Sequence, residues 1–156
     1  MLSPAIRQAS YCFAFEDDFV GNWRCIPLCL RRKLDLAGIK LRLTHWLAFD
    51  QQQRQVLVDW PDDADALQAM ATHIRGLTRT MPQGEVSALA PANAESWQVG
   101  DLPQQVARSA AGVQRPITSA QWNALAELER FALCKLARAG GHDHHNLASC
   151  LREILG

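Results

Sequence analysis

The sequence predicts an all-α fold, a compact helical domain of about six helices. The strong helix formers Ala and Leu occur 23 and 20 times, whereas the β-branched Val and Ile occur only 7 and 6 times. Strict alternation of apolar and polar residues is confined to residues 39–43, which allow at most one short strand or an extended linker. With 156 residues, the chain suits a single domain over 1–156 and can bury a core without metal or disulfide bonds.

Residues 1–22 are expected to form an irregular N-terminal arm. Three acidic residues, Glu16-Asp17-Asp18, lie there among Phe13, Phe15 and Phe19. We expect the aromatic rings to pack on the core and the carboxylates to stay in water.

The first two helices are expected over about 26–37 and 44–59. Pro27 suits a first helical turn, and Gly38 can adopt the positive φ with which many helices end. A break is expected near Asp50, because the glutamine three residues later completes a capping-box pattern.

The second half of the chain is expected to be helical after a long loop. Apolar residues at helical spacing and the positions of Pro and Gly set the expected bounds. The elements are a helix over about 64–80, a loop over about 81–100 held by Trp97, a helix from about 102 to 111, a helix over about 118–138 that can break near Ala126, and a last helix over about 145–155.

An internal similarity predicts a pseudo-repeated helix-loop-helix unit. In each half a proline precedes a tryptophan by 19 residues, and an arginine follows that tryptophan by eight. The alternative is chance similarity between amphipathic helices. The matched residues, 76 positions apart, include Pro27 and Pro103, Trp46 and Trp122, and Arg54 and Arg130.

Composition excludes several classes of function. Sixteen basic residues balance sixteen acidic ones, which argues against a generally basic nucleic-acid-binding protein. No apolar run approaches the ~20 residues of a membrane-spanning helix, and the N-terminus lacks the apolar stretch of a secretory signal. Together with an odd number of cysteines, five, these observations predict a cytoplasmic protein with reduced thiols.

Residues 24–42 carry the only strong local charge bias in the sequence. Six basic residues face one acidic residue in this segment. Such a segment can bind an acidic protein partner or DNA, or its charges can be solvated or paired with the acidic residues near 16–18 and 59–65. The residues predicted to bind a partner are Arg24, Arg31, Arg32, Lys33 and Lys40.

Two groups of residues have side chains that could bind a metal ion. His142, His144 and His145 are close in sequence, but neighbouring ligands cannot all converge on one ion, and no second ligand pair is evident. Cys25 and Cys29 share a helical face, yet two thiols without a third nearby do not make an iron–sulfur site. We therefore expect no metal and no cofactor, and whether either group binds metal stays open.

No catalytic residues are predicted. The sequence lacks a glycine-rich phosphate loop, a Ser–His–Asp pattern and a dinucleotide-binding motif. Glu127 and Glu129 point about 200° apart on a helix, so they are poorly placed to act as an acid–base pair.

Several motifs resemble the nitrate reductase-associated protein family. The similarity covers roughly residues 11–155 and departs from the family pattern at Cys29 and around His142-Asp143. The motifs are Phe15-Glu16-Asp17-Asp18-Phe19, Arg24-Cys25-Ile26-Pro27, Arg31-Arg32-Lys33-Leu34-Asp35, Gly38-Ile39-Lys40-Leu41, Trp46, Phe49, Arg54, Trp122, Leu125, Arg130-Phe131-Ala132-Leu133, Lys135-Leu136, His142 and Asn146.

The resemblance implies a non-catalytic accessory or maturation factor for assimilatory nitrate reductase, which would be its protein partner. One alternative is a protein that carries or inserts the molybdenum cofactor or an iron–sulfur cluster, using Cys25 or the histidines near His142. Another is a DNA-binding regulator of nitrogen assimilation, which the zero net charge disfavours. The oligomeric state stays open.

Overall fold

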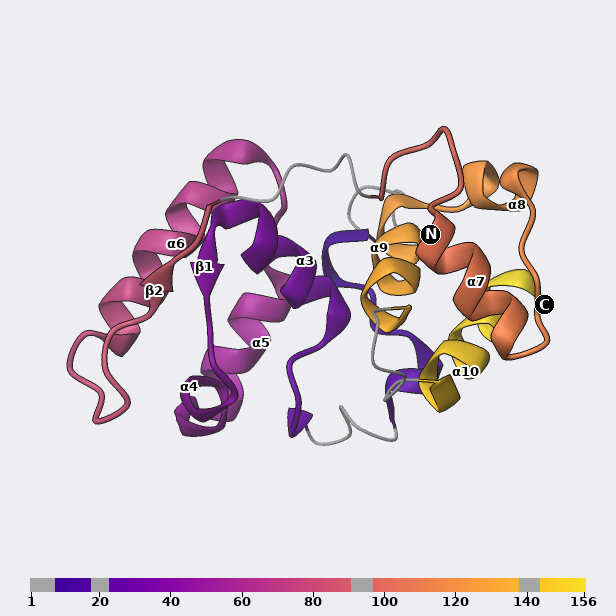
Figure 1. Cartoon of the computed structure of the whole chain (residues 1–156). Helices are drawn as coiled ribbons and strands as arrows, with labels where there is room; N and C mark the ends of the chain where they lie inside the picture. The colour runs from indigo at the N-terminus through magenta and orange to yellow at the C-terminus, as the bar shows by residue number, and fades with distance from the viewer. Residues whose placement is uncertain (1–7, 18–22, 91–96, 138–143) are drawn as a thin grey trace. The chain divides into compact units, whose positions relative to one another are not determined.

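The computed structural model describes residues 8–17, 23–90, 97–137 and 144–156 of the chain (Figure 1). Within these residues the fold is mostly helical. Tertiary contacts gather the chain into two compact units. Unit 1 comprises residues 1–12 and 18–93, and unit 2 comprises residues 13–17 and 94–156.

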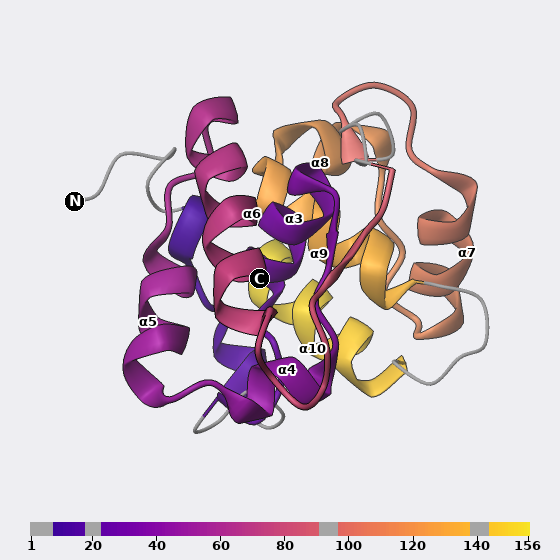
Figure 2. The same cartoon turned by 90° about the vertical axis from the view of Figure 1, so that its left-hand side faces the viewer.

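Among the elements whose bounds the structure describes, unit 1 has four α-helices and a small antiparallel sheet. Its helix α3 packs against α5 and α6 (Figure 2). Two-residue strands, labelled β1 and β2 in Figure 1, pair Ile39 with Ala88 and Lys40 with Ser87. The elements are α3 (Leu28–Ala37), β1 (Ile39–Lys40), α4 (Leu43–Ala48), α5 (Gln51–Asp59), α6 (Ala64–Thr78) and β2 (Ser87–Ala88).

Local sequence sets the helix ends in unit 1. Pro27 precedes α3 in an extended conformation, and Gly38 ends the helix with φ of 74°. The carboxylate of Asp50 accepts a hydrogen bond from the Gln53 backbone N–H, so α5 starts where the capping box predicted. Asp63 caps α6 in the same way through the Ala66 N–H.

The core of unit 1 forms where these helices meet. Successive turns of α3 and α6 bring apolar side chains to the inner face at helical spacing. The buried apolar residues include Leu30, Leu34, Ile39, Trp46, Leu57, Met70 and Ile74.

In the described residues of unit 2, the elements with assigned bounds are four α-helices and one 3₁₀ turn. Helix α10 packs against α7, α9 and η1, and a buried apolar core fills the space among them. The elements are η1 (Ala14–Glu16), α7 (Gln104–Gly112), α8 (Ser119–Ala124), α9 (Glu127–Leu136) and α10 (His144–Leu155).

The predicted helical class is confirmed, but the number of helices is larger than about six. The described residues form nine helices, counting η1. The two long helices expected over 44–59 and 118–138 are each divided in two, at Phe49 and Leu125, whose extended backbone ends the helical hydrogen bonding. The prediction of one domain over 1–156 concerns how the two units join, and it stays a prediction.

Glu16 corrects the expectation for the N-terminal arm. Its side chain is buried, and its Oε2 accepts the backbone N–H of Phe13, the N-cap residue of η1, at 2.8 Å. That N–H has no partner within the helix, so the carboxylate is held inside by this bond. Asp17 is exposed, as expected. Asp18 and Phe19 lie outside the described residues.

Helix starts in the two units follow a constant spacing. The first residues of α3 and α7, of α4 and α8, and of α5 and α9 are each 76 positions apart. This spacing equals the one on which the predicted pseudo-repeat rests.

Candidate functional site

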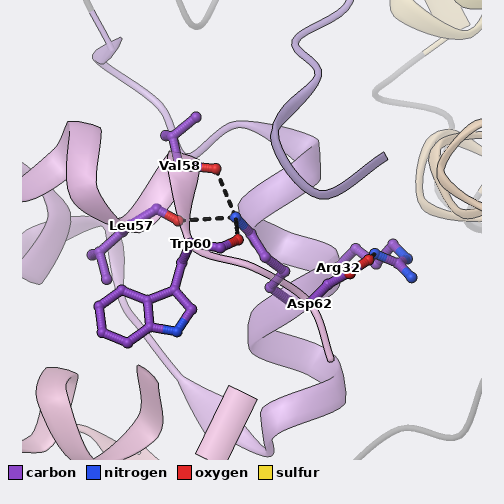
Figure 3. Close-up of polar contacts among 6 residues, drawn as sticks. Arg32, Leu57, Val58, Trp60 and Asp62 are labelled. Atoms are coloured by element: carbon purple, nitrogen blue, oxygen red, sulfur yellow. Dashed lines mark hydrogen bonds and ion pairs between the residues drawn. The ribbon is translucent and has the colours of Figure 1, made fainter. Parts of the chain in front are cut away.

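Lys33, one of the five cations predicted to bind a partner, is fully buried in unit 1. Its ammonium nitrogen donates to the backbone oxygens of Leu57 at 2.9 Å, Val58 at 2.7 Å and Trp60 at 2.8 Å (Figure 3). Carbonyls at the end of a helix lack partners within the helix, and an ammonium has three protons to donate. Lys33 therefore caps the C-terminal end of α5 and joins it to α3.

The surroundings of Lys33 act on its proton affinity in opposite directions. Burial disfavours the charged form and lowers the pKa of Lys33 from 10.5 to about 8. Electrostatic interactions with Cys29, Asp62 and Asp59 oppose part of that change. The amine is therefore still protonated at pH 7 and can use all three protons.

Arg32 is also turned inward. Its Nη1 lies 2.9 Å from Oδ2 of Asp62, and the two side chains are 5% and 21% exposed (Figure 3). Asp62 belongs to the acidic stretch 59–65, so part of the basic segment pairs within unit 1, which was one of the open alternatives. This ion pair is partly shielded from water and fixes α3 against the segment before α6.

The other three predicted cations differ from these two in exposure. Arg24 and Lys40 are exposed, and Arg31 is half-buried. Folding thus occupies Arg32 and Lys33, while Arg24, Arg31 and Lys40 present charge to solvent. Binding of a partner by these residues stays a prediction.

Trp46 and Arg54 form a clamp in unit 1. The carbonyl of Trp23 accepts the Trp46 indole N–H at 2.6 Å and Nη1 of Arg54 at 3.2 Å. Arg54 also donates to the carbonyls of Trp46 and Leu47 at the end of α4, both at 3.1 Å. Trp23 adopts φ of 54°, unusual for a bulky residue, and these bonds hold its carbonyl in place.

Trp122 and Arg130 form a similar clamp in unit 2. The Trp122 indole N–H donates to the Gln98 carbonyl at 3.1 Å. Nε of Arg130 donates to the Trp97 carbonyl at 2.6 Å, and its Nη1 donates to the carbonyl of Leu125, which ends α8. Burial lowers the pKa of Arg130, yet the guanidinium keeps its fork of donors for these carbonyls.

His45 is a buried polar residue that the sequence reasoning missed. Its Nδ1 accepts the Arg42 backbone N–H at 3.2 Å, so the proton must lie on Nε2, which contacts the Gly84 carbonyl at 2.8 Å. The ring joins the start of α4 to the turn at residues 81–84. Its place three residues after the N-cap was the available signal.

The structure describes only some of the candidate metal ligands. Cys25 is half-buried and Cys29 is buried, whereas His145 is exposed. His142 and the side chain of His144 lie outside the described residues. Within the described ranges, no group of three or more His, Cys, Asp or Glu residues is placed to hold a metal ion.

The family assignment follows from a comparison with known families. The sequence model of the conserved nitrate reductase-associated proteins matches residues 12–154, nearly the whole chain. The chain belongs to this family. No curated protein and no solved structure matches it. In this nitrate reductase-associated protein, the motif residues Trp46, Arg54, Trp122 and Arg130 hold helix ends and loops together.

The surface of this family member includes two large apolar side chains on one short helix. Leu43 is 48% exposed and Leu47 is 51% exposed, and they lie one turn apart on α4. The exposed cations Lys40 and Arg42 precede them in the chain. Among the helices that the structure describes, none is both long and apolar enough to span a membrane.

Proposed function

We propose that this protein is a non-catalytic accessory factor for assimilatory nitrate reductase and that it acts by binding the enzyme or its immature form. The observation that carries the proposal is the family match over residues 12–154, because the family is described by its association with nitrate reductase.

The use of its ionisable side chains supports binding over catalysis. Lys33, Arg32 and Arg130 donate to carbonyls or a carboxylate that fix helix ends. Burial, together with nearby carboxylates, raises the pKa of Cys150 and keeps it a thiol rather than a nucleophilic thiolate. These groups serve the fold, which leaves the exterior to act on other molecules.

Binding could assist the reductase only through a difference in affinity between its two forms. If the protein binds the immature enzyme tenfold more tightly than the mature one, it stabilises the immature form by about 1.4 kcal/mol. That preference would hold a cofactor cleft open, or shield it, until the cofactor arrives, and would release the finished enzyme.

The proposed contact uses the predicted cations that reach solvent. An acidic partner surface would suit Arg24, Arg31 and Lys40. Attraction to these charges would speed association, and salt would screen that attraction. The proposal also places the protein in the cytoplasm, where thiols are kept reduced.

Purified protein and nitrate reductase provide the test. We expect the two to co-purify and the yield of active reductase to fall in cells that lack the protein. The Arg24→Glu, Arg31→Glu double variant should bind more weakly, whereas Arg108→Glu, at an exposed position on α7, serves as the charge-matched control. Absence of any complex, or turnover of a substrate by the isolated protein, would overturn the proposal.

A further inference from the structure

Two exposed basic residues precede α4, and the helix itself carries two exposed leucines. Leu43 and Leu47 are each about half exposed, and Lys40 and Arg42 are exposed just before them. The guanidinium of Arg42 is oriented by a hydrogen bond from Nη2 to the Gln83 carbonyl at 2.6 Å. We call Lys40, Arg42, Leu43 and Leu47 together the α4 face.

The opposite side of α4 is firmly held. His45 and Trp46 are fully buried, and each bonds a backbone carbonyl outside the helix. Arg54 fixes the last turn through the Leu47 carbonyl. The two leucines are therefore presented on a rigid helix, which lowers the entropy lost when a partner binds.

Folding of this kind of helix does not require exposed leucines or cations. Helix α8 has the same length as α4, starts 76 positions later and buries Trp122 as α4 buries Trp46. At the C-terminal end of each helix an arginine donates to a backbone carbonyl: Arg54 to that of Leu47 in α4, and Arg130 to that of Leu125, which follows α8. At the positions that correspond to the α4 face, unit 2 carries Pro116, Thr118, Ser119 and Asn123.

Two of these unit 2 residues form hydrogen bonds that stabilise the local structure. Thr118 caps α8 through the Gln121 N–H, and the Asn123 side chain exchanges hydrogen bonds with the backbone of Gly100. Polar residues thus suffice at these positions of the helix. Arg42 has a local bond of its own, to the Gln83 carbonyl, so the exposed leucines and Lys40 are the residues of the α4 face that need an explanation outside the fold of unit 1.

We propose that the α4 face, which shares Lys40 with the cations proposed above, is part of the docking surface for the protein partner, and that the docked segment presents apolar side chains with carboxylates beside them. The leucines would be covered by the apolar side chains, and Lys40 and Arg42 would face the carboxylates. The first carboxylate after the α4 face in sequence, Asp50, is occupied in capping α5. This inference rests on the proposed function and names the surface through which nitrate reductase is bound.

Unit 2 supplies the substitutions for the test. Leu43→Ser with Leu47→Asn gives α4 the residues that α8 carries, so the fold should be kept, which thermal unfolding checks. Val99→Ser, at a position 62% exposed in unit 2, is the apolar control. A second variant, Lys40→Glu with Arg42→Glu, reverses the charges.

Affinity for purified nitrate reductase is then measured at low and moderate salt. We expect the leucine variant to bind at least about tenfold more weakly, as central apolar contacts do, and Val99→Ser to match the wild type. The charge variant should bind weakly, and the salt dependence of binding should largely disappear. If the wild type binds and the leucine variant binds equally well, the docking surface is refuted while the proposed function stands.

The remaining outcomes are equally decisive. Weak binding by the leucine variant with unchanged binding by the charge variant would overturn the acidic character of the docked segment. A wild-type protein that binds no nitrate reductase would refute the proposed function itself, and this inference with it.

Discussion

Replacing Lys33 by methionine removes the three hydrogen bonds that join α3 to the end of α5. The carbonyls of Leu57, Val58 and Trp60 would then lie without that donor beside an apolar side chain. Methionine has a similar length and no charge, so the change tests the amine rather than the volume of the side chain.

The magnitude follows from two opposing contributions. Each buried carbonyl that loses its partner costs about 1–3 kcal/mol, or about 6 kcal/mol for three. The change in pKa from 10.5 to about 8 corresponds to a penalty of about 3 kcal/mol for holding the charged amine in the fold, which methionine relieves. The expected net loss of unfolding free energy at pH 7 is about 3 kcal/mol.

The pH dependence carries the sharper prediction. Between pH 8 and 10.5 the unfolded chain keeps the Lys33 proton that the folded chain has lost, so wild-type stability gains from this residue as pH rises. The gain is about 3 kcal/mol and is absent from Lys33→Met. The difference in stability between the two proteins should therefore widen from about 3 to about 6 kcal/mol over this range.

Urea unfolding at several pH values measures this difference. Subtraction of the two curves is needed because burial also raises the pKa of Cys134 to about 11, which lowers stability as the pH rises past 9. Lys40→Met removes an exposed amine and should keep the wild-type pH dependence. A constant difference between wild type and Lys33→Met from pH 7 to 10.5 would refute the reasoning that burial governs this amine.

Three further predictions concern unit 2 and, in one case, Cys12 of unit 1. Arg130→Lys should lower the unfolding free energy by about 2–3 kcal/mol in urea unfolding, because an ammonium cannot reproduce the forked bonds to two carbonyls; an unchanged midpoint would contradict the clamp. Glu153 accepts the first two backbone N–H groups of η1, so Glu153→Gln should cost about 1 kcal/mol by thermal unfolding, and no loss would show that the carboxylate is dispensable there. In a thiol titration with a disulfide reagent, the exposed Cys12 should react in the native protein and the buried Cys150 only after unfolding, whereas rapid reaction of Cys150 would refute its burial.

Much of the fold could be predicted because its signals are local. Asp50 and Gln53 interact within one helical turn, and Gly38 needs only its own freedom to adopt φ of 74°. Capping spacing and periodic apolar residues therefore located most helices, including both breaks. The count of about six was low because a two-part helix and a single bent helix share one apolar pattern.

The candidate site was harder to predict, because a charged residue in a sequence does not reveal whether its side chain points into the protein or to solvent. Five cations between residues 24 and 40 look alike in composition, yet Arg24 and Lys40 reach solvent while Arg32 and Lys33 turn inward. The exposure of Leu43 and Leu47 was equally invisible, since leucines four residues apart on a helix usually mark a buried face.

The amino-acid order by itself determined the helical class, the helix ends and the family, since each depends on neighbours within a few residues or on a linear pattern. Only the tertiary structure decided which polar side chains are buried and used in hydrogen bonds inside the protein. The carbonyls at the end of α5 lie about 25 residues from Lys33 along the chain. Lys33 is buried because these carbonyls have no partner within the helix and its ammonium group donates hydrogen bonds to them.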